Sequence, residues 1–134
     1  MNDEEIKELL GTAKTIAVVG LSTNPEKDSY RVADYLLKHG YRVIPVNPMA
    51  DNILGQSCKP TLADINEPVD IVDVFRRPDD ALKVAQESLE SANRTVWFQL
   101  GTIHPADAEK ARNLGLKLVT DRCIMREHRR LFSK

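Results

Sequence analysis

The chain has 134 residues, enough to bury one hydrophobic core and too few for two, so we expect residues 1–134 to form a single domain. Its 19 basic and 20 acidic side chains give a formal net charge of -1, which excludes a bulk binder of nucleic acid or of a membrane surface. Only 5% of the residues are aromatic, which argues against a base-stacking platform for single strands.

Targeting and redox signals are also weak. No apolar run approaches the length that would span a bilayer, and the acidic start at residues 2–5 is unlike a secretory signal. The two cysteines, Cys58 and Cys123, do not make a disulfide framework. We therefore expect a cytoplasmic protein with no membrane or nucleic-acid partner.

Short apolar runs and helical segments alternate along the chain. A first helix is expected to carry Ile6, Leu9 and Leu10 after a cap at Asn2 or Asp3. The apolar runs are rich in Val and Ile, typical of strands buried on both faces, and occupy residues 15–19, 41–46, 69–75, 95–98 and 116–120. Further helices are predicted to begin near Ser29, Pro78, Pro105 and Ile124.

The segment from 47 to 68 breaks this alternation. It contains three prolines and one glycine and has weak periodicity, so we predict a long loop with one helical turn near 61–65. Long loops of this kind are often functional.

The element order β-α-β-loop-β-α-β-α-β predicts a three-layer α/β fold with helices on both faces of a five-stranded parallel sheet. Counting the predicted strands along the chain, we expect the order 3-2-1-4-5. Ligands would then bind at the switch point between the first and fourth strands. In this order the strand 69–75 lies at the sheet edge, where Asp73 could face water, so we assign Asp73 no role.

The loop after the first strand is the strongest functional signal. A glycine at position 20 lets the backbone approach a ligand closely, and amides from Ser22 onward can donate to phosphate oxygens that Lys27 and Arg31 neutralise. The amino end of the helix that begins near Ser29 is also expected to bind the anion. The candidate binding residues here are Gly20, Leu21, Ser22, Asn24, Lys27 and Ser29. The alternative is an ordinary strand-to-helix turn capped by Ser29.

This loop lacks the usual dinucleotide signature. Ser22 and Pro25 stand where the pattern Gly-x-Gly-x-x-Gly needs its later glycines, and the loop is not a Gly-x-x-x-x-Gly-Lys-Ser/Thr motif either. No acid follows the second strand until Asp51, so an unmodified NAD site is disfavoured.

The ends of three other strands add candidates at the same edge. Val46, Asn47 and Pro48 could form a rigid apolar slot for an adenine, with Asn47 as its polar reader, or simply a strand-ending turn. The third predicted strand ends in a pair of arginines, which suits a ligand with more than two negative charges unless they are solvated or paired with a nearby Asp. The candidates on the third and fourth strands are Phe75, Arg76, Arg77, Gln99 and Gly101.

Groups that could perform catalysis are few. Cys123 and His128 could form an activated thiolate, but no third group is evident, and a plain reduced cysteine is the simpler reading. Two ligands are also too few for a metal site. We therefore assign no catalytic residue and no metal ligand.

Five motifs, in order along nearly the whole chain, resemble one known family. They are Val-Val-Gly-Leu-Ser at 18–22, Ile-Pro-Val-Asn-Pro at 44–48, Asp-Ile-Val-Asp-Val-Phe-Arg-Arg-Pro at 70–78, Trp-Phe-Gln-Leu-Gly at 97–101 and Asp-Arg-Cys-Ile-Met-Arg-Glu-His at 121–128. The chain is similar to the small single-domain coenzyme A-binding proteins, which resemble the nucleotide-binding domain of the succinyl-coenzyme A synthetase alpha subunit.

The resemblance implies a Rossmann-like fold that binds coenzyme A, with the pyrophosphate at the first loop and the adenosine end near the second strand. It does not imply ligase activity, because the synthetase's second domain has no counterpart here. We therefore predict a binding or regulatory module for coenzyme A or an acyl-coenzyme A, as a monomer or homodimer. The alternatives are an NAD(P)-dependent oxidoreductase on the same fold and a ligand-free scaffold that docks a partner through its basic C-terminal helix.

Overall fold

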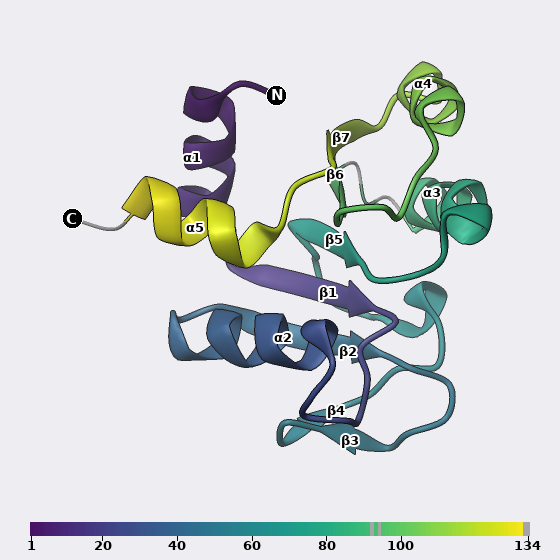
Figure 1. Cartoon of the computed structure of the whole chain (residues 1–134). Helices are drawn as coiled ribbons and strands as arrows, with labels where there is room; N and C mark the ends of the chain where they lie inside the picture. The colour runs from purple at the N-terminus through teal and green to yellow at the C-terminus, as the bar shows by residue number, and fades with distance from the viewer. Residues whose placement is uncertain (92, 94, 133–134) are drawn as a thin grey trace.

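The computed structural model describes residues 1–91, 93 and 95–132 (Figure 1). A parallel sheet at its centre is built from β1 (Thr15–Val19), β2 (Arg42–Val46), β5 (Ile71–Val74), β6 (Thr95–Phe98) and β7 (Lys117–Thr120). The order of these strands across the sheet is β2-β1-β5-β6-β7. The helices are α1 (Asp3–Thr12), α2 (Asp28–Lys38), α3 (Ala81–Glu90), α4 (Pro105–Asn113) and α5 (Ile124–Phe132).

Helices cover both faces of the sheet, as predicted. On one face α1, α2 and α5 pack around the fully buried Ile6, Leu36 and Trp97. On the other face α3 and α4 pack over Val72 and Phe98, and Figure 1 shows this pair set apart from the first three helices. Because successive side chains of a strand point to opposite faces, two cores require apolar residues at nearly every strand position. None of the helices within the described residues is long and apolar enough to cross a membrane.

The predicted strand order was wrong in one respect. The third predicted strand, now β5, lies between β1 and β6 rather than at the sheet edge. The carboxylate of Asp70 accepts hydrogen bonds from the backbone N–H groups of Lys14 (2.8 Å) and Thr15 (2.9 Å), which ties the start of β5 to the start of β1. The chain therefore winds to one side of β1 to form β2 and to the other side to form β5, and the switch point lies between β1 and β5.

The connection between β2 and β5 is more ordered than predicted. It contains a short hairpin of β3 (Asn52–Ile53) and β4 (Gln56–Ser57), whose turn residues Leu54 and Gly55 both have positive φ. The predicted helical turn is confirmed as the 3-10 helix η1 (Leu62–Asp64), and a second 3-10 helix, η2 (Pro78–Asp80), precedes α3. Within the described residues, the crossover contains no α-helix between β2 and β5, and it passes beside the outer edge of β2, where Lys59 forms a single parallel bridge with Val46.

The central position of β5 changes the environment of Asp73. Its neighbours in register are Val18 on β1 and Trp97 on β6, and the residue is 0% exposed. Neither carboxylate oxygen has a hydrogen-bond partner among the described residues. Burial therefore raises the pKa of the Asp73 carboxyl well above its usual range, and the expectation that Asp73 could face water was wrong.

Candidate ligand-binding rim

Three adjoining hollows follow the carboxyl ends of β1, β2, β5 and β6, and we call this surface the carboxyl rim. The first-loop hollow, about 380 Å³, is lined by Gly20, Ser22, Lys27, Asp28, Ser29 and Phe75. The strand-two hollow, about 290 Å³, is lined on its rim side by Val19, Val46, Pro48 and Arg76. The α2–α5 hollow, about 170 Å³, is lined by Asp28, Arg31, Val32, Phe75, Gln99, Leu100, Thr102, Cys123, Met125 and Arg126.

The three hollows meet across the switch point. Asp28 and Phe75 line both the first-loop hollow and the α2–α5 hollow. Gly20 on the first side and Arg76 on the second approach each other so closely that a Cβ atom on Gly20 would lie 3.0 Å from Arg76 Cδ. The strand-two hollow and the first-loop hollow thus adjoin at the contact between Gly20 and Arg76, within reach of one elongated ligand.

The first loop holds its own shape through short side chains. The backbone N–H of Ser22 donates to Ser29 Oγ, that of Asn24 to Ser22 Oγ, and that of Glu26 to Asn24 Oδ1, each at 3.0 Å. These three amides, which were predicted to donate to phosphate, make their hydrogen bonds within the loop. The other predicted place for the anion is the start of the helix near Ser29.

The amino end of α2 provides donors for an anion. Its N-cap residue, Lys27, makes no side-chain cap bond, and the backbone N–H groups of Asp28, Ser29 and Tyr30 have no partner in the described chain. Unpaired amides and the helix dipole together favour an anion here. Asp28 adds a negative charge, but its carboxylate pairs with Arg31, while Lys27 has no ion-pair partner among the described residues.

Gly20 is required by the chain itself. Its φ is +84°, and a Cβ atom there would lie 2.3 Å from the backbone oxygen of Phe75. The end of β5 is this close because the Phe75 N–H donates to Val19 O at 2.8 Å. We predicted that the glycine lets a ligand approach the backbone. The close approach of β5 is a second and independent reason why this position must be glycine.

Asn47 links the end of β2 to the first loop. Its Nδ2 donates to Leu21 O at 2.9 Å, and its Oδ1 accepts from the Met49 N–H at 2.7 Å. The Leu21 side chain is only 1% exposed and lies in the core, so this residue presents only backbone to the rim. The role of Asn47 as an adenine reader stays a prediction, whereas Val46 and Pro48 do line the strand-two hollow.

The two arginines after β5 differ in position. Arg76 lines the strand-two hollow and pairs with Asp80 at 3.3 Å, with almost half of its side chain exposed. Exposed pairs contribute little, so a bound anion could draw Arg76 away from Asp80 at small cost. Arg77 is also exposed but lines none of the three hollows.

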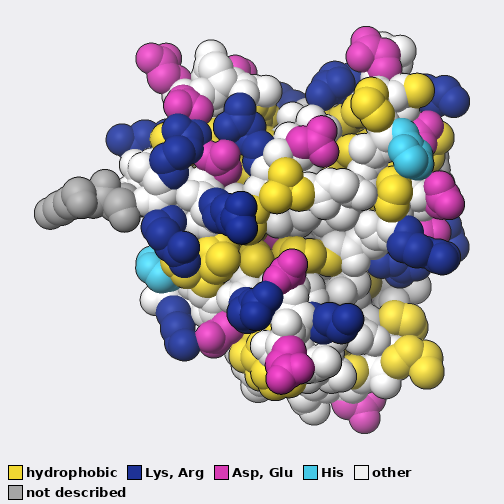
Figure 2. Space-filling view, viewed as in Figure 1, with side chains coloured by type: hydrophobic (Ala, Val, Ile, Leu, Met, Phe, Trp, Pro, Cys, Tyr) yellow, Lys and Arg dark blue, Asp and Glu magenta, His cyan; other side chains and the backbone are white. Residues whose placement is uncertain are grey.

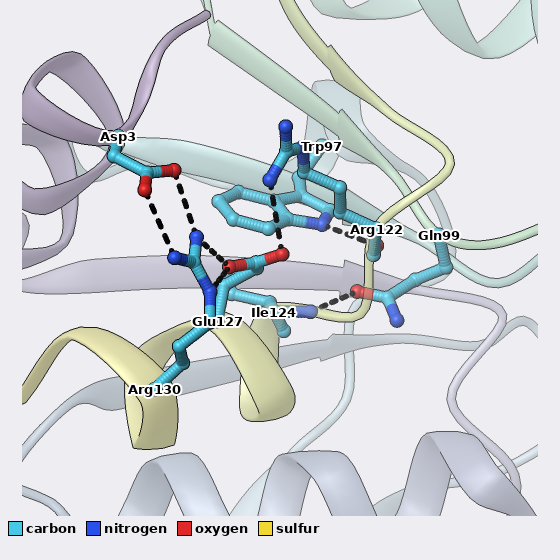
Figure 3. A network of polar contacts seen from close by, with 7 residues as sticks. All are labelled: Asp3, Trp97, Gln99, Arg122, Ile124, Glu127 and Arg130. Atoms are coloured by element: carbon cyan, nitrogen blue, oxygen red, sulfur yellow. Dashed lines mark hydrogen bonds and ion pairs between the residues drawn. The ribbon is translucent and has the colours of Figure 1, made fainter. Parts of the chain in front are cut away.

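Gln99 joins β6 to the start of α5. Its Oε1 accepts from the Ile124 N–H at 3.1 Å (Figure 3). Its backbone oxygen accepts from Thr102 Oγ1 at 2.6 Å. Gln99 is 5% exposed and lines the α2–α5 hollow, whereas the predicted Gly101 is exposed and lines none of the three.

The amino end of α5 was missed as a site element. Cys123, Met125 and Arg126 line the α2–α5 hollow opposite α2. The only sequence signal that could have placed them at the site is the family motif at 121–128. His128 is turned to another neighbour, since its Nδ1 lies 2.7 Å from Tyr35 Oη. The structure therefore shows no Cys123–His128 hydrogen bond among the described residues, and burial and the nearby His39 lower the pKa of His128.

The basic side chains and a fourth, larger hollow lie on different parts of the surface. Figure 2 shows basic side chains gathered over α5 and near the amino end of α2. The larger hollow, about 560 Å³, lies at the opposite edge of the sheet between α1 and β7, and its charged lining residues are Glu5, Glu8, Arg112 and Lys117. The nearby amino end of α1 is capped by Asn2, so that hollow lacks the free amides of the rim.

No cluster of three potential metal ligands occurs in the described parts of the chain.

These features can be compared with known proteins. The model of the family described as "CoA binding domain" matches residues 14–129. This chain belongs to that family. It is 40% identical over 124 residues to the YneT protein of Bacillus subtilis, covering 92% of each chain.

Two further similar proteins are a small protein of known structure and a much larger ligase. A hypothetical protein from Pyrococcus horikoshii has a TM-score of 0.94 at 41% identity, covering 99% of this chain and 94% of that one. An ADP-forming acetate–CoA ligase of Archaeoglobus fulgidus is 37% identical over 60 residues, 43% of this chain but only 9% of the ligase. The predicted resemblance and the Rossmann-like α/β fold are thereby confirmed.

Proposed function

We propose that this protein binds coenzyme A along the carboxyl rim and serves as a binding or regulatory module. The observation that carries the proposal is the uncapped amino end of α2, where three unpaired amides and Lys27 adjoin the first-loop hollow. The pyrophosphate would bind there, and membership of the CoA-binding domain family supports that choice of ligand.

The other parts of coenzyme A would follow the two neighbouring hollows. The adenosine end fits the strand-two hollow, whose apolar wall includes Val46 and Pro48 and whose rim carries Arg76. The pantetheine arm would then cross Phe75 toward the α2–α5 hollow. The absence of an acid directly after β2 fits this choice better than a nicotinamide dinucleotide.

We propose binding rather than ligation. The chain matches less than a tenth of the acetate–CoA ligase, so the ligase's chemistry requires parts that lie outside the match. The likeness supports a shared ligand-binding domain.

Calorimetric titration of dialysed protein tests the proposal. Coenzyme A should bind at micromolar concentration, about -8 kcal/mol, with NAD and NADP weak or silent. Lys27→Ala should weaken coenzyme A binding about tenfold, or about 1.4 kcal/mol. The matched control is Lys38→Ala at the other end of α2, which should leave binding unchanged. NADP binding without coenzyme A binding would overturn the proposal in favour of an oxidoreductase, and no binding of any of the three would favour a scaffold.

A further inference from the structure

The side-chain amide of Gln99 is held in one orientation with its donor group free. A backbone N–H can only donate, so the bond from the Ile124 N–H fixes Oε1 toward α5 and turns Nε2 away from it (Figure 3). Gln99 is only 5% exposed, yet its Nε2 makes no hydrogen bond to any residue in the described chain.

This free donor is reached from the α2–α5 hollow. Among the described residues, the fully buried side-chain atoms without a partner are the two oxygens of Asp73, so Gln99 Nε2 is not sealed in the core. Gln99 itself lines the hollow. A ligand that supplies a well-placed acceptor here replaces water at a donor already held in one orientation, and so gains affinity.

Five of the nine other residues that line the hollow are apolar, namely Val32, Phe75, Leu100, Cys123 and Met125. The carboxylate of Asp28 is paired with Arg31, the hydroxyl of Thr102 donates to Gln99 O, and the exposed Arg126 completes the lining. The volume is about 170 Å³, close to the cavity of about 150 Å³ that accommodates benzene. The hollow therefore suits a small apolar group that carries one acceptor oxygen.

We propose that the α2–α5 hollow binds the acyl group of a short-chain acyl-coenzyme A, with Gln99 Nε2 donating to the thioester carbonyl. This inference rests on the proposed function, because the pantetheine arm must first reach the hollow. The thiol of free coenzyme A is only a weak acceptor, so it would leave Nε2 without a good partner. An acyl group of two to four carbons fits the volume, and a longer chain would have to leave the hollow.

Matched ligands isolate the carbonyl. In calorimetric titrations, acetyl-coenzyme A should bind about tenfold more tightly than S-ethyl-coenzyme A, in which a methylene replaces the thioester carbonyl. In Gln99→Glu this ratio should fall to one or below, because the carboxylate still accepts from the Ile124 N–H but has no N–H to donate and repels the carbonyl oxygen. Both ligands carry the same net charge, so repulsion between the new carboxylate and the phosphates cancels in the ratio.

Two further variants complete the test. Gln86→Glu adds the same charge on the exposed surface of α3 and should keep the tenfold ratio. Cys123→Leu narrows the hollow and should weaken butyryl-coenzyme A several-fold more than free coenzyme A. Equal affinity of the wild-type protein for acetyl- and S-ethyl-coenzyme A would overturn this inference while leaving the proposed function intact. Failure of every coenzyme A derivative to bind would overturn the proposed function itself.

Discussion

The loops that follow β1 and β6 both reach the carboxyl rim, but they are held in place in different ways. In the loop after β1, Ser22, Asn24 and Ser29 accept bonds from the loop amides, while Asn47 and the backbone of Phe75 hold it to the neighbouring strands. In the loop after β6, Thr102 bonds to the Gln99 backbone oxygen, and a long-range bond from Ile124 holds the Gln99 side chain. The first arrangement leaves helix amides free for an anion, and the second leaves one side-chain donor free for a neutral acceptor.

The largest expected effect comes from a pair of glycines, one in each loop. Gly20 and Gly101 both have positive φ, but a Cβ on Gly20 would meet backbone at 2.3 Å, whereas one on Gly101 meets nothing within 4 Å. Gly20→Ala should therefore cost about 3 kcal/mol or more of unfolding free energy, and Gly101→Ala only about 1–2 kcal/mol. Urea unfolding of both variants makes the comparison, and equal losses would show that the contact with Phe75 does not limit position 20.

The long-range bond should matter less than the glycine contact, but it is measurable. Gln99→Ala leaves the Ile124 N–H without its acceptor in a residue that is 0% exposed, which should cost about 1–3 kcal/mol of unfolding free energy. Gln99→Glu keeps an acceptor and should cost less. Urea unfolding of the two variants checks this order, and a glutamate variant that is less stable than the alanine variant would contradict it.

Asp73 lies in β5, the strand between the two loops, and its effect should depend on pH. The pKa of this carboxyl is raised in the folded state, so the unfolded chain loses the proton first as pH rises. The stability due to the protonated acid is present below the unfolded value, about pH 4, and is lost as pH rises toward the folded pKa. Asp73→Asn lacks this loss, so its stability relative to wild type should increase from pH 4 to neutrality in urea unfolding. If the stabilities of the two proteins instead changed in parallel with pH, the pKa of Asp73 would not be raised in the folded state, which would contradict its burial.

The smallest expected effect on stability is at the amino end of α2. Lys27 is exposed and makes no ion pair among the described residues, so Lys27→Ala should change the unfolding free energy by less than about 0.5 kcal/mol. Its predicted loss of coenzyme A affinity would then be a binding effect rather than a folding effect. Thermal unfolding without ligand separates the two, and a large drop in the melting temperature would show that Lys27 supports the fold.

Local signals in the sequence predicted most of the elements. Asn2 caps α1 through a box with Glu5, and Pro105 stands at the start of α4, because both signals act within a few residues. Buried apolar runs likewise marked the five strands of the sheet. The candidate residues around the first loop could be named for the same reason, since a glycine, hydroxyls and a lysine stand close together in the chain.

Contacts between distant residues decided what the sequence could not show. The order of the sheet follows from the pairing of β5 with β1, to which Asp70 adds bonds to Lys14 and Thr15, more than fifty residues away. The orientation of Gln99 depends on Ile124, twenty-five residues away, so neither motif alone reveals the free donor. The use of the loop amides by Ser22 and Ser29 was also hidden, because a serine near a phosphate loop is equally suited to bind ligand or backbone.

The most direct test of the account is a coenzyme A titration followed through the backbone amide signals of isotope-labelled protein. Coenzyme A on the carboxyl rim should shift most the amides of Asp28, Ser29 and Tyr30, which are unpaired in the described chain, with smaller changes at Gln99. If coenzyme A saturates the protein but the largest amide shifts fall around Glu5 and Lys117, at the hollow on the opposite edge, the result would contradict a coenzyme A site on the carboxyl rim.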